Sequence, residues 1–165
     1  MMAHEFYHNV LTPGLVKAAM FAPELAADRS LDVLMTTIAG QESDWTYLVQ
    51  EDGGAAHGLF QMQENDIQDI MTNLVSEKLF VAGMDDFGIN TRTAAHLWDI
   101  LSTTAGESLS VFLARLNLWC DPRPIPAYDD QTALFEYYSA TWRPARPNFK
   151  RWQMVYGLAM TAVPA

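Results

Sequence analysis

The sequence has little of three things: cysteine, positive charge and long apolar runs. Its single cysteine, Cys120, excludes an internal disulfide bond. The formal net charge of -10 argues against a nucleic-acid partner, which needs a basic protein face. The apolar runs are too short for a transmembrane helix, so we expect no membrane insertion. The first residues lack a basic start and a long apolar stretch, so we expect no secretory signal peptide.

What the chain does contain is enough apolar material for one folded domain. It has 165 residues, of which 50% are hydrophobic, with five tryptophans and nine methionines. A chain of this length buries roughly two thirds of its unfolded surface when it folds. We find no internal repeat, low-complexity run or long linker, so residues 1–165 are predicted to form a single domain.

Apolar spacing and capping residues predict a mainly α fold. Thr12-Pro13 has the composition of a helix start, and Pro23 is expected to bend or restart that helix. Ser30 is expected to cap the next helix, which carries Glu42 near its C-terminal end. Further helices are predicted at 67–75, from Asn90 or Thr91 to Leu101, at 109–119, from Asp129 or Asp130 to Trp142, and from Asn148 to Ala159. Residues 46–49 are predicted as a short strand or hairpin, 82–90 as a loop with Gly83 and Gly88, and 121–126 as a proline-rich connection.

One helical face carries a single acid among large apolar side chains. The residues at helical spacing are Leu31, Leu34, Met35, Ile38, Glu42 and Trp45. Loss of water raises the pKa of a carboxyl group, and a general acid that holds its proton near neutral pH needs such surroundings. Glu42 is therefore the candidate catalytic acid. The alternative, which position alone favours, is that Glu42 lies just past the helix end and points to solvent.

A motif follows Glu42. Ser43-Asp44-Trp45 comes next, and after a polar segment the chain reads Gly53-Gly54-Ala55-Ala56-His57-Gly58-Leu59-Phe60-Gln61-Met62. A Glu-Ser pair followed by a Gly-Ala-rich turn into Gly-Leu-aromatic-Gln-Met resembles the active-site signature of the lytic transglycosylase and goose-type lysozyme families. Later segments resemble more particularly a lysozyme-like group carried by tailed bacteriophages; they are Cys120-Asp121-Pro122-Arg123-Pro124-Ile125-Pro126, Tyr137-Tyr138 and Trp142-Arg143-Pro144.

The resemblance implies a lysozyme-like fold with a small irregular or β-hairpin lobe beside a sugar cleft. It implies cleavage of the MurNAc–GlcNAc β-1,4 bond of peptidoglycan, with Glu42 protonating the glycosidic oxygen. The substrate-binding residues would be Ser43, Gly58, Leu59 and Gln61 from the motif, together with the aromatic pair Tyr137 and Tyr138. Adjacent tyrosines on a helix point roughly 100° apart, and packing in the core is at least as good an interpretation of this pair as stacking on a sugar.

The sequence leaves the reaction outcome open. In the transglycosylase variant, the resemblance implies that Glu42 also removes a proton from the sugar 6-hydroxyl, and the substrate's N-acetyl group replaces a second carboxylate. In the goose-type variant, a second carboxylate positions water. The candidates for it are Asp44, Glu51, Asp52 and Glu64. Asp52 precedes two glycines, where a short acid also suits an Asx-turn, and that structural role is favoured.

The remaining expectations concern metals, partners and place. The four histidines, at positions 4, 8, 57 and 96, complete no metalloprotease signature, so we expect no metal and no cofactor. The expected partners are peptidoglycan glycan strands and other virion proteins. The expected location is a virion, or the cytoplasm or periplasm of an infected bacterium. The alternative function is a virion structural or glycan-binding protein that has a lysozyme-like fold with little turnover; the acidic charge and the missing signal peptide fit it.

Overall fold

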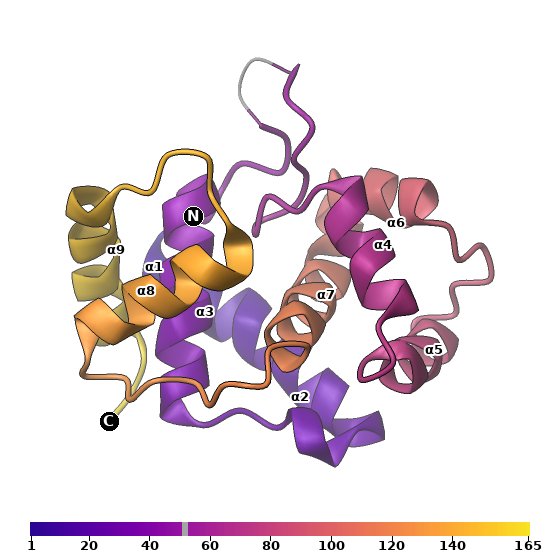
Figure 1. The fold of residues 1–165 in the computed structure, drawn as a ribbon, viewed down its shortest axis with the longest axis horizontal. Helices are drawn as coiled ribbons and strands as arrows, with labels where there is room; N and C mark the ends of the chain where they lie inside the picture. The colour runs from indigo at the N-terminus through magenta and orange to yellow at the C-terminus, as the bar shows by residue number, and fades with distance from the viewer. Residues whose placement is uncertain (51–52) are drawn as a thin grey trace.

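The computed structural model describes residues 1–50 and 53–165, and these are mainly helical, as the apolar spacing predicts (Figure 1). The α-helices are α1 (Ala3–Phe6), α2 (Thr12–Phe21), α3 (Arg29–Ser43), α4 (Glu64–Thr72), α5 (Glu77–Asp86), α6 (Ala94–Leu101), α7 (Glu107–Trp119), α8 (Gln131–Trp142) and α9 (Phe149–Ala162). Between some of them lie a π-helical turn, η1 (Tyr7–Leu11), and the 3-10 turns η2 (Pro23–Leu25) and η4 (Thr104–Gly106). In the part of the chain that the structure describes, no helix has both the length and the apolar character to cross a bilayer.

The helices fall into two groups that meet near α7 (Figure 1). One group contains α1, α3, α8 and α9, and the other contains α4, α5 and α6. Helix α3 packs on α9, α2 on α7 and α4 on α6, and the buried side chains form one continuous apolar cluster. Phe60, Phe112 and Trp152 are among its largest members. The segment between α3 and α4 passes from one group to the other, so a site at that segment has walls from both.

Helix α3 forms because its N-terminus is capped and one of its faces is apolar. Asp28 is the cap, since its side chain accepts a hydrogen bond of 2.9 Å from a backbone N–H of the first turn. The prediction that Ser30 caps this helix is wrong, because Ser30 lies inside the first turn and its hydroxyl accepts from the backbone N–H of Tyr128. The prediction that Glu42 lies near the C-terminal end is confirmed, because α3 ends at Ser43.

An α-helix begins at Thr12, as predicted, but Thr12 does not cap it, because helical backbone continues there from upstream. The turn η1 joins α1 to α2 without a break, and Thr12 has helical backbone angles rather than those of a cap. A π-helical turn bonds one residue farther along the chain than an α-helix does, which accommodates Pro13, whose ring has no N–H to donate. The predicted interruption at Pro23 is confirmed, since α2 ends at Phe21 and Pro23 begins the turn η2.

The loop predicted at 82–90 is wrong for its first half, because α5 runs to Asp86. Gly83 lies inside α5 and makes room for the ring of Phe112, since a Cβ at this position would lie 2.3 Å from that ring. This glycine therefore marks a close contact between helices rather than a break. Gly88 follows α5 with a φ of 67°, in the left-handed region that often ends a helix.

The other helix boundaries lie close to those predicted. Thr93 caps α6, two or three residues beyond the predicted positions, by accepting a hydrogen bond from a backbone N–H of the first turn. Helix α4 ends at Thr72, so residues 73–75, predicted to be helical, lie beyond its end. Asp130 caps α8 and Asn148 caps α9, as predicted.

The segment that joins α3 to α4 is irregular (Figure 1). Its described residues form isolated antiparallel bridges centred on His57, one of them to Val49, rather than regular strands. The strand or hairpin predicted at 46–49 is thus reduced to single bridge pairs. Glu51 and Asp52, both candidates for a second carboxylate, lie outside the described residues.

Candidate active site

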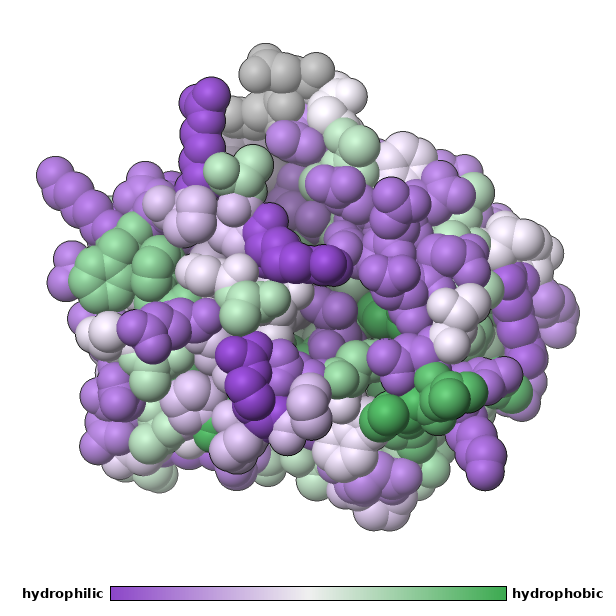
Figure 2. All heavy atoms as spheres, in the orientation of Figure 1, coloured by the Kyte–Doolittle hydropathy of each residue, from purple (hydrophilic) through white to green (hydrophobic). Residues whose placement is uncertain are grey.

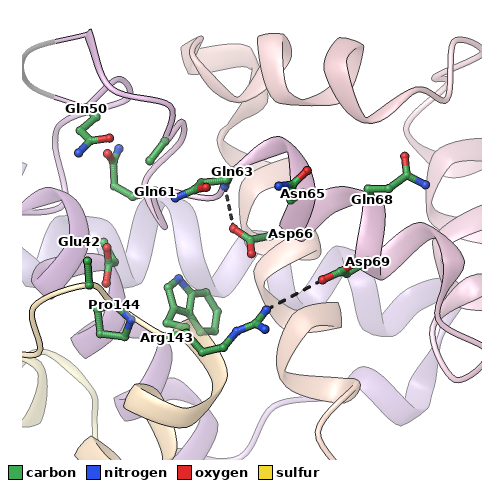
Figure 3. Close-up of a pocket in the computed structure, with 13 residues that line it drawn as sticks. Glu42, Gln50, Gln61, Gln63, Asn65, Asp66, Gln68, Asp69, Arg143 and Pro144 are labelled. Atoms are coloured by element: carbon green, nitrogen blue, oxygen red, sulfur yellow. Dashed lines mark hydrogen bonds and ion pairs between the residues drawn. The ribbon is translucent and has the colours of Figure 1, made fainter.

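A groove of about 710 Å³ opens where the two helix groups meet (Figure 3). Its lining comes from the last turn of α3, the end of the irregular segment, α4, and the chain at and after the end of α8. Hydrophilic side chains dominate this part of the face, with a hollow between them (Figure 2). The described lining includes the amides Gln50, Gln61, Gln63, Asn65 and Gln68, the acids Glu42, Asp66 and Asp69, and the cation Arg143.

Glu42 lies in the last turn of α3, with its side chain partly buried at the wall of the groove. Loss of water has the largest effect on this group and raises the pKa of Glu42 to about 6. The hydrogen bond from Tyr138 and the charge of Arg151 lower the pKa, and the charge of Asp66 raises it. The raised pKa predicted from the apolar stripe is confirmed, and the alternative of a fully solvated side chain is wrong. Glu42 can therefore hold a proton close to neutral pH.

Tyr138 fixes the carboxyl group of Glu42 in place. Its hydroxyl donates a hydrogen bond of 2.5 Å to Oε1 of Glu42, which connects α8 to α3. The tyrosine is 1% exposed, and its ring stacks on Trp152 with ring centres 4.8 Å apart. Burial and the nearby Glu42 carboxylate raise the pKa of Tyr138. The hydroxyl therefore stays protonated and can donate this hydrogen bond. The prediction that Tyr138 binds a sugar face is corrected: its ring faces the core, and its hydroxyl positions the acid.

Arg151, from α9, holds the end of α3. Its Nε donates to the backbone oxygen of Gln41 at 3.1 Å, and its Nη2 donates to that of Gly40 at 2.8 Å. These carbonyl groups lie at the negative end of the helix dipole, where a cation is favourable. Nη2 also pairs with Oδ1 of Asp44 at 2.7 Å. Asp44 is the left-handed C-cap of α3 and does not line the groove, so the prediction of Asp44 as a second carboxylate is wrong.

The motif residues Ser43, Gly58 and Leu59 support the groove from behind. Ser43 is 2% exposed, and its hydroxyl donates to the backbone oxygen of Leu59 at 2.7 Å, which ties α3 to the motif. Gly58 has a φ of 76°, and a Cβ there would lie 2.8 Å from the hydroxyl oxygen of Ser110. Leu59 is part of the apolar core. The predictions that these three residues bind substrate are corrected, because their burial leaves no surface for a sugar.

Gln61 does line the groove, as the motif predicts. Its backbone is left-handed, with a φ of 48°, which turns the chain at this point. Its Nε2 donates to the backbone oxygen of Gly58 at 2.9 Å and to that of Tyr47 at 3.3 Å. These bonds hold the side-chain amide on the same side of the groove as Glu42 (Figure 3). The binding of substrate by Gln61 stays a prediction.

Tyr137 points away from the groove. Its hydroxyl donates to the backbone oxygen of Leu118 at 3.5 Å, and its ring packs against the guanidinium of Arg123. It lines a second pocket, whose other walls come mainly from the end of α7 and the chain that follows it. Neighbouring residues on a helix project about 100° apart, so Tyr138 reaches Glu42 and Tyr137 does not. The prediction that Tyr137 binds the sugar in the groove is wrong for this reason.

Helix α4 supplies two groove acids that the motif does not predict, Asp66 and Asp69. Oδ2 of Asp66 accepts from the backbone N–H of Gln63 at 2.8 Å, which caps α4. Oδ2 of Asp69 lies 3.9 Å from Nη2 of Arg143, so this pair spans the groove (Figure 3). A signal for both acids is present in the sequence: they are three residues apart, so they project from neighbouring turns of α4, beside its buried isoleucines.

Asp66 takes the place of the carboxylates that the sequence suggested. Glu64 is exposed at the start of α4 and does not line the groove, and Asp52 lies outside the described residues. Asp66 lines the groove, and its charge acts on the pKa of Glu42. The groove thus combines one group that can give a proton near neutral pH with a second carboxylate that can orient water.

Among the described residues, no group of three or more histidine, cysteine, aspartate and glutamate side chains has the geometry of a metal site. His57 stacks on Trp98 with ring centres 3.7 Å apart, and its Nδ1 lies 3.0 Å from the backbone oxygen of the same residue, so it has a packing role. No family model, curated protein or solved structure matches the chain. The chemistry of the groove must therefore be argued from its own residues.

Proposed function

We propose that this protein cleaves the MurNAc–GlcNAc β-1,4 bond of peptidoglycan, with Glu42 as general acid and then general base. The observation that carries the proposal is the carboxyl group of Glu42 at a polar groove, with a pKa of about 6 and a hydrogen bond from Tyr138. Such a group is half protonated near pH 6, which suits a residue that first gives a proton and then takes one.

The walls of the groove suit a polymer rich in hydroxyl and acetamido groups. Gln50, Gln61, Gln63, Asn65 and Gln68 line it, and each side-chain amide can both donate and accept hydrogen bonds. Sugar hydroxyls and N-acetyl groups need partners of both kinds. The volume of about 710 Å³ lies within the usual range for sites that enclose organic ligands.

The motif from Glu42 to Met62 supports the choice of peptidoglycan, because it resembles the signature of lytic transglycosylases and goose-type lysozymes. We accordingly propose a lysozyme-like fold, in which the irregular segment between α3 and α4 is the lobe beside the cleft. The proline-rich and tyrosine segments resemble lysozyme-like proteins of tailed bacteriophages. We therefore propose an enzyme of bacteriophage origin that acts in wall penetration or lysis.

The proposed reaction begins when the carboxyl proton of Glu42 moves to the glycosidic oxygen and the bond from C1 to that oxygen breaks. Glu42 is left as a carboxylate, which the hydroxyl of Tyr138 stabilises at Oε1. Two second steps are compatible with the groove. Glu42 removes a proton either from the sugar 6-hydroxyl, which gives a 1,6-anhydro end, or from a water molecule that Asp66 orients, which gives a reducing end.

The direct test is Glu42→Gln, measured as the release of soluble fragments from purified peptidoglycan. Glu136→Gln, at an exposed position of α8, makes the same change in charge and is the matched control. Loss of a general acid lowers the rate by about 10²- to 10⁴-fold, and we expect a loss in that range for the first variant only. Undiminished release by Glu42→Gln would remove Glu42 from the mechanism.

The same assay also separates the outcomes of the reaction. Mass analysis of the fragments distinguishes 1,6-anhydro ends from reducing ends, which decides between transglycosylase and hydrolase. If the wild-type protein sediments with peptidoglycan but releases no fragments, the function is glycan binding rather than cleavage.

A further inference from the structure

A second pocket lies apart from the groove and has a volume of about 430 Å³; we name it the Arg115 pocket. Two guanidinium groups lie over aromatic rings in its wall. Arg115 lies over Trp119 and Arg123 over Tyr137, each 5.1 Å from the ring centre. The rest of the wall is largely apolar and includes Leu118, Pro122, Pro124 and Ile125.

The two arginines differ in their partners. Arg123 is exposed and pairs through two nitrogens with Asp121, at 2.9 Å and 2.5 Å. Arg115 is 5% exposed, and its Nε donates to the backbone oxygen of Leu25 at 3.2 Å. Among the described residues, no carboxylate lies within ion-pair distance of Arg115, and no acceptor bonds its terminal nitrogens. Those nitrogens are not fully sealed from solvent, and Arg115 is one of the residues that line the pocket.

A buried guanidinium without an anion is unfavourable. Loss of water lowers the pKa of Arg115; Tyr137 and Asp28 oppose this electrostatically, and Asp28 does so from beyond ion-pair distance. Arginine nevertheless keeps its charge in proteins, so the group needs an anion with hydrogen-bond acceptors. Its two terminal nitrogens have the fork geometry that a carboxylate matches. The apolar wall requires that this carboxylate be attached to a small apolar body.

The Arg115 pocket and the groove each share lining residues with a third hollow. This hollow has a volume of about 240 Å³ and shares Arg143 with the groove, and Asp121 and Pro122 with the Arg115 pocket. A branched ligand whose main chain occupies the groove can therefore extend a side branch to Arg115. Peptidoglycan is such a ligand, because short peptides with small apolar residues and free carboxylates branch from its sugar chain.

We propose that the Arg115 pocket binds the terminal carboxylate of the short peptide branch of the substrate. The carboxylate oxygens accept from the terminal nitrogens of Arg115, and the small side chains contact Trp119 and Ile125. That the peptide belongs to peptidoglycan rests on the proposed function. That the ligand is a carboxylate attached to a small apolar group rests on the pocket alone.

The test uses N-acetyl-D-alanyl-D-alanine and its C-terminal amide as probes, titrated into the whole chain and followed by nuclear magnetic resonance. Charge-assisted hydrogen bonds are about twice as strong as neutral ones, so we expect the amide to bind at least about tenfold more weakly. Equal binding of the two probes, or binding of neither, would overturn the proposal.

Two neighbouring exposed residues give a matched pair of variants. Val75 is 57% exposed and lines the Arg115 pocket, whereas Leu74 is 90% exposed and does not; hydrophobic side chains gather near this α4–α5 segment (Figure 2). Val75→Glu places a carboxylate at the pocket and should weaken binding about tenfold or more, by repulsion or by occupying Arg115. Leu74→Glu makes the same charge change outside the pocket and should alter binding less than about twofold. Equal effects of the two variants would refute the assignment.

This experiment separates the pocket from the proposed reaction. Binding of the dipeptide does not need Glu42, so it should persist in Glu42→Gln. Dipeptide binding by a protein that fails to cleave peptidoglycan would overturn the proposed function and leave the carboxylate site. Cleavage of peptidoglycan without dipeptide binding would overturn the carboxylate site and leave the proposed function. If both hold, Val75→Glu should raise KM for peptide-bearing glycan strands and leave cleavage of peptide-free strands unchanged.

Discussion

Replacing Glu42 by glutamine removes a carboxyl group that folding makes harder to ionise. Its pKa is about 6 in the folded chain, against 4.5 in water. The folded state therefore keeps this proton over a pH range in which the unfolded state has lost it. The resulting contribution to the free energy of unfolding is fully present below pH 4.5 and is lost as the pH rises through 6. The gap between the two pKa values corresponds to about 2 kcal/mol.

Glutamine has nearly the same shape, and its Oε1 can still accept from Tyr138, but it carries no charge at any pH. We therefore expect Glu42→Gln to match the wild type in free energy of unfolding at about pH 4. At about pH 8 we expect the variant to be more stable by about 2 kcal/mol. Urea denaturation across this range, followed by tryptophan fluorescence, measures the difference directly.

The control for this prediction is Glu136→Gln, which makes the same charge change at an exposed position of α8. Its difference from the wild type should stay nearly constant with pH. A constant difference for Glu42→Gln as well would refute the argument that loss of water dominates at this carboxyl group. A difference of opposite slope would mean that folding favours the ionised form.

Two further predictions test the surroundings of the acid and the packing of the helices. Tyr138→Phe removes the hydroxyl that lowers the pKa of Glu42. The alkaline limb of the profile of activity against pH should therefore move up by about one pH unit, and the maximal rate should fall. An alkaline limb at the same pH would contradict the positioning role of Tyr138. Gly83→Ala places a methyl group 2.3 Å from the ring of Phe112 and should lower the free energy of unfolding by about 1–3 kcal/mol in urea denaturation. Gly157→Ala adds a methyl group at an exposed position of α9, with no atom within 4 Å, and should raise the free energy of unfolding by about 0.5–1 kcal/mol. Equal effects of the two alanine substitutions would contradict the packing argument.

The features that could be predicted from the sequence are those with local causes. Glu42 follows Ile38 by four residues, so the two share a helical face, and burial of that face desolvates the acid. Asp130 and Asn148 cap their helices by bonds to N–H groups three residues away, which depend on nothing else in the chain. Proline likewise marks the end of α2 through its own geometry.

The features that could not be predicted depend on contacts between distant segments. In the sequence, Gly83 indicates a loop. Its role as a contact between helices is visible only once Phe112 is known to pack against it. In the sequence, the motif predicts that Ser43 binds a sugar. In the structure the motif folds back, and the hydroxyl of Ser43 bonds to the backbone oxygen of Leu59. The second groove acid, Asp66, comes from a helix whose polar face has a use only when α8 lies opposite.

The two contacts that fix the acid both come from late in the chain. Tyr138 lies 96 residues beyond Glu42, and Arg151 reaches back 110 residues to the carbonyl group of Gln41. A polypeptide cut short before α8 would carry the whole motif yet hold an ordinary glutamate with no tyrosine beside it. A nascent chain still on the ribosome is in the same condition until α8 and α9 emerge and dock. In the proposed reaction the acid is therefore in place only after α8 and α9 have docked, and a fragment that lacks them should be inert.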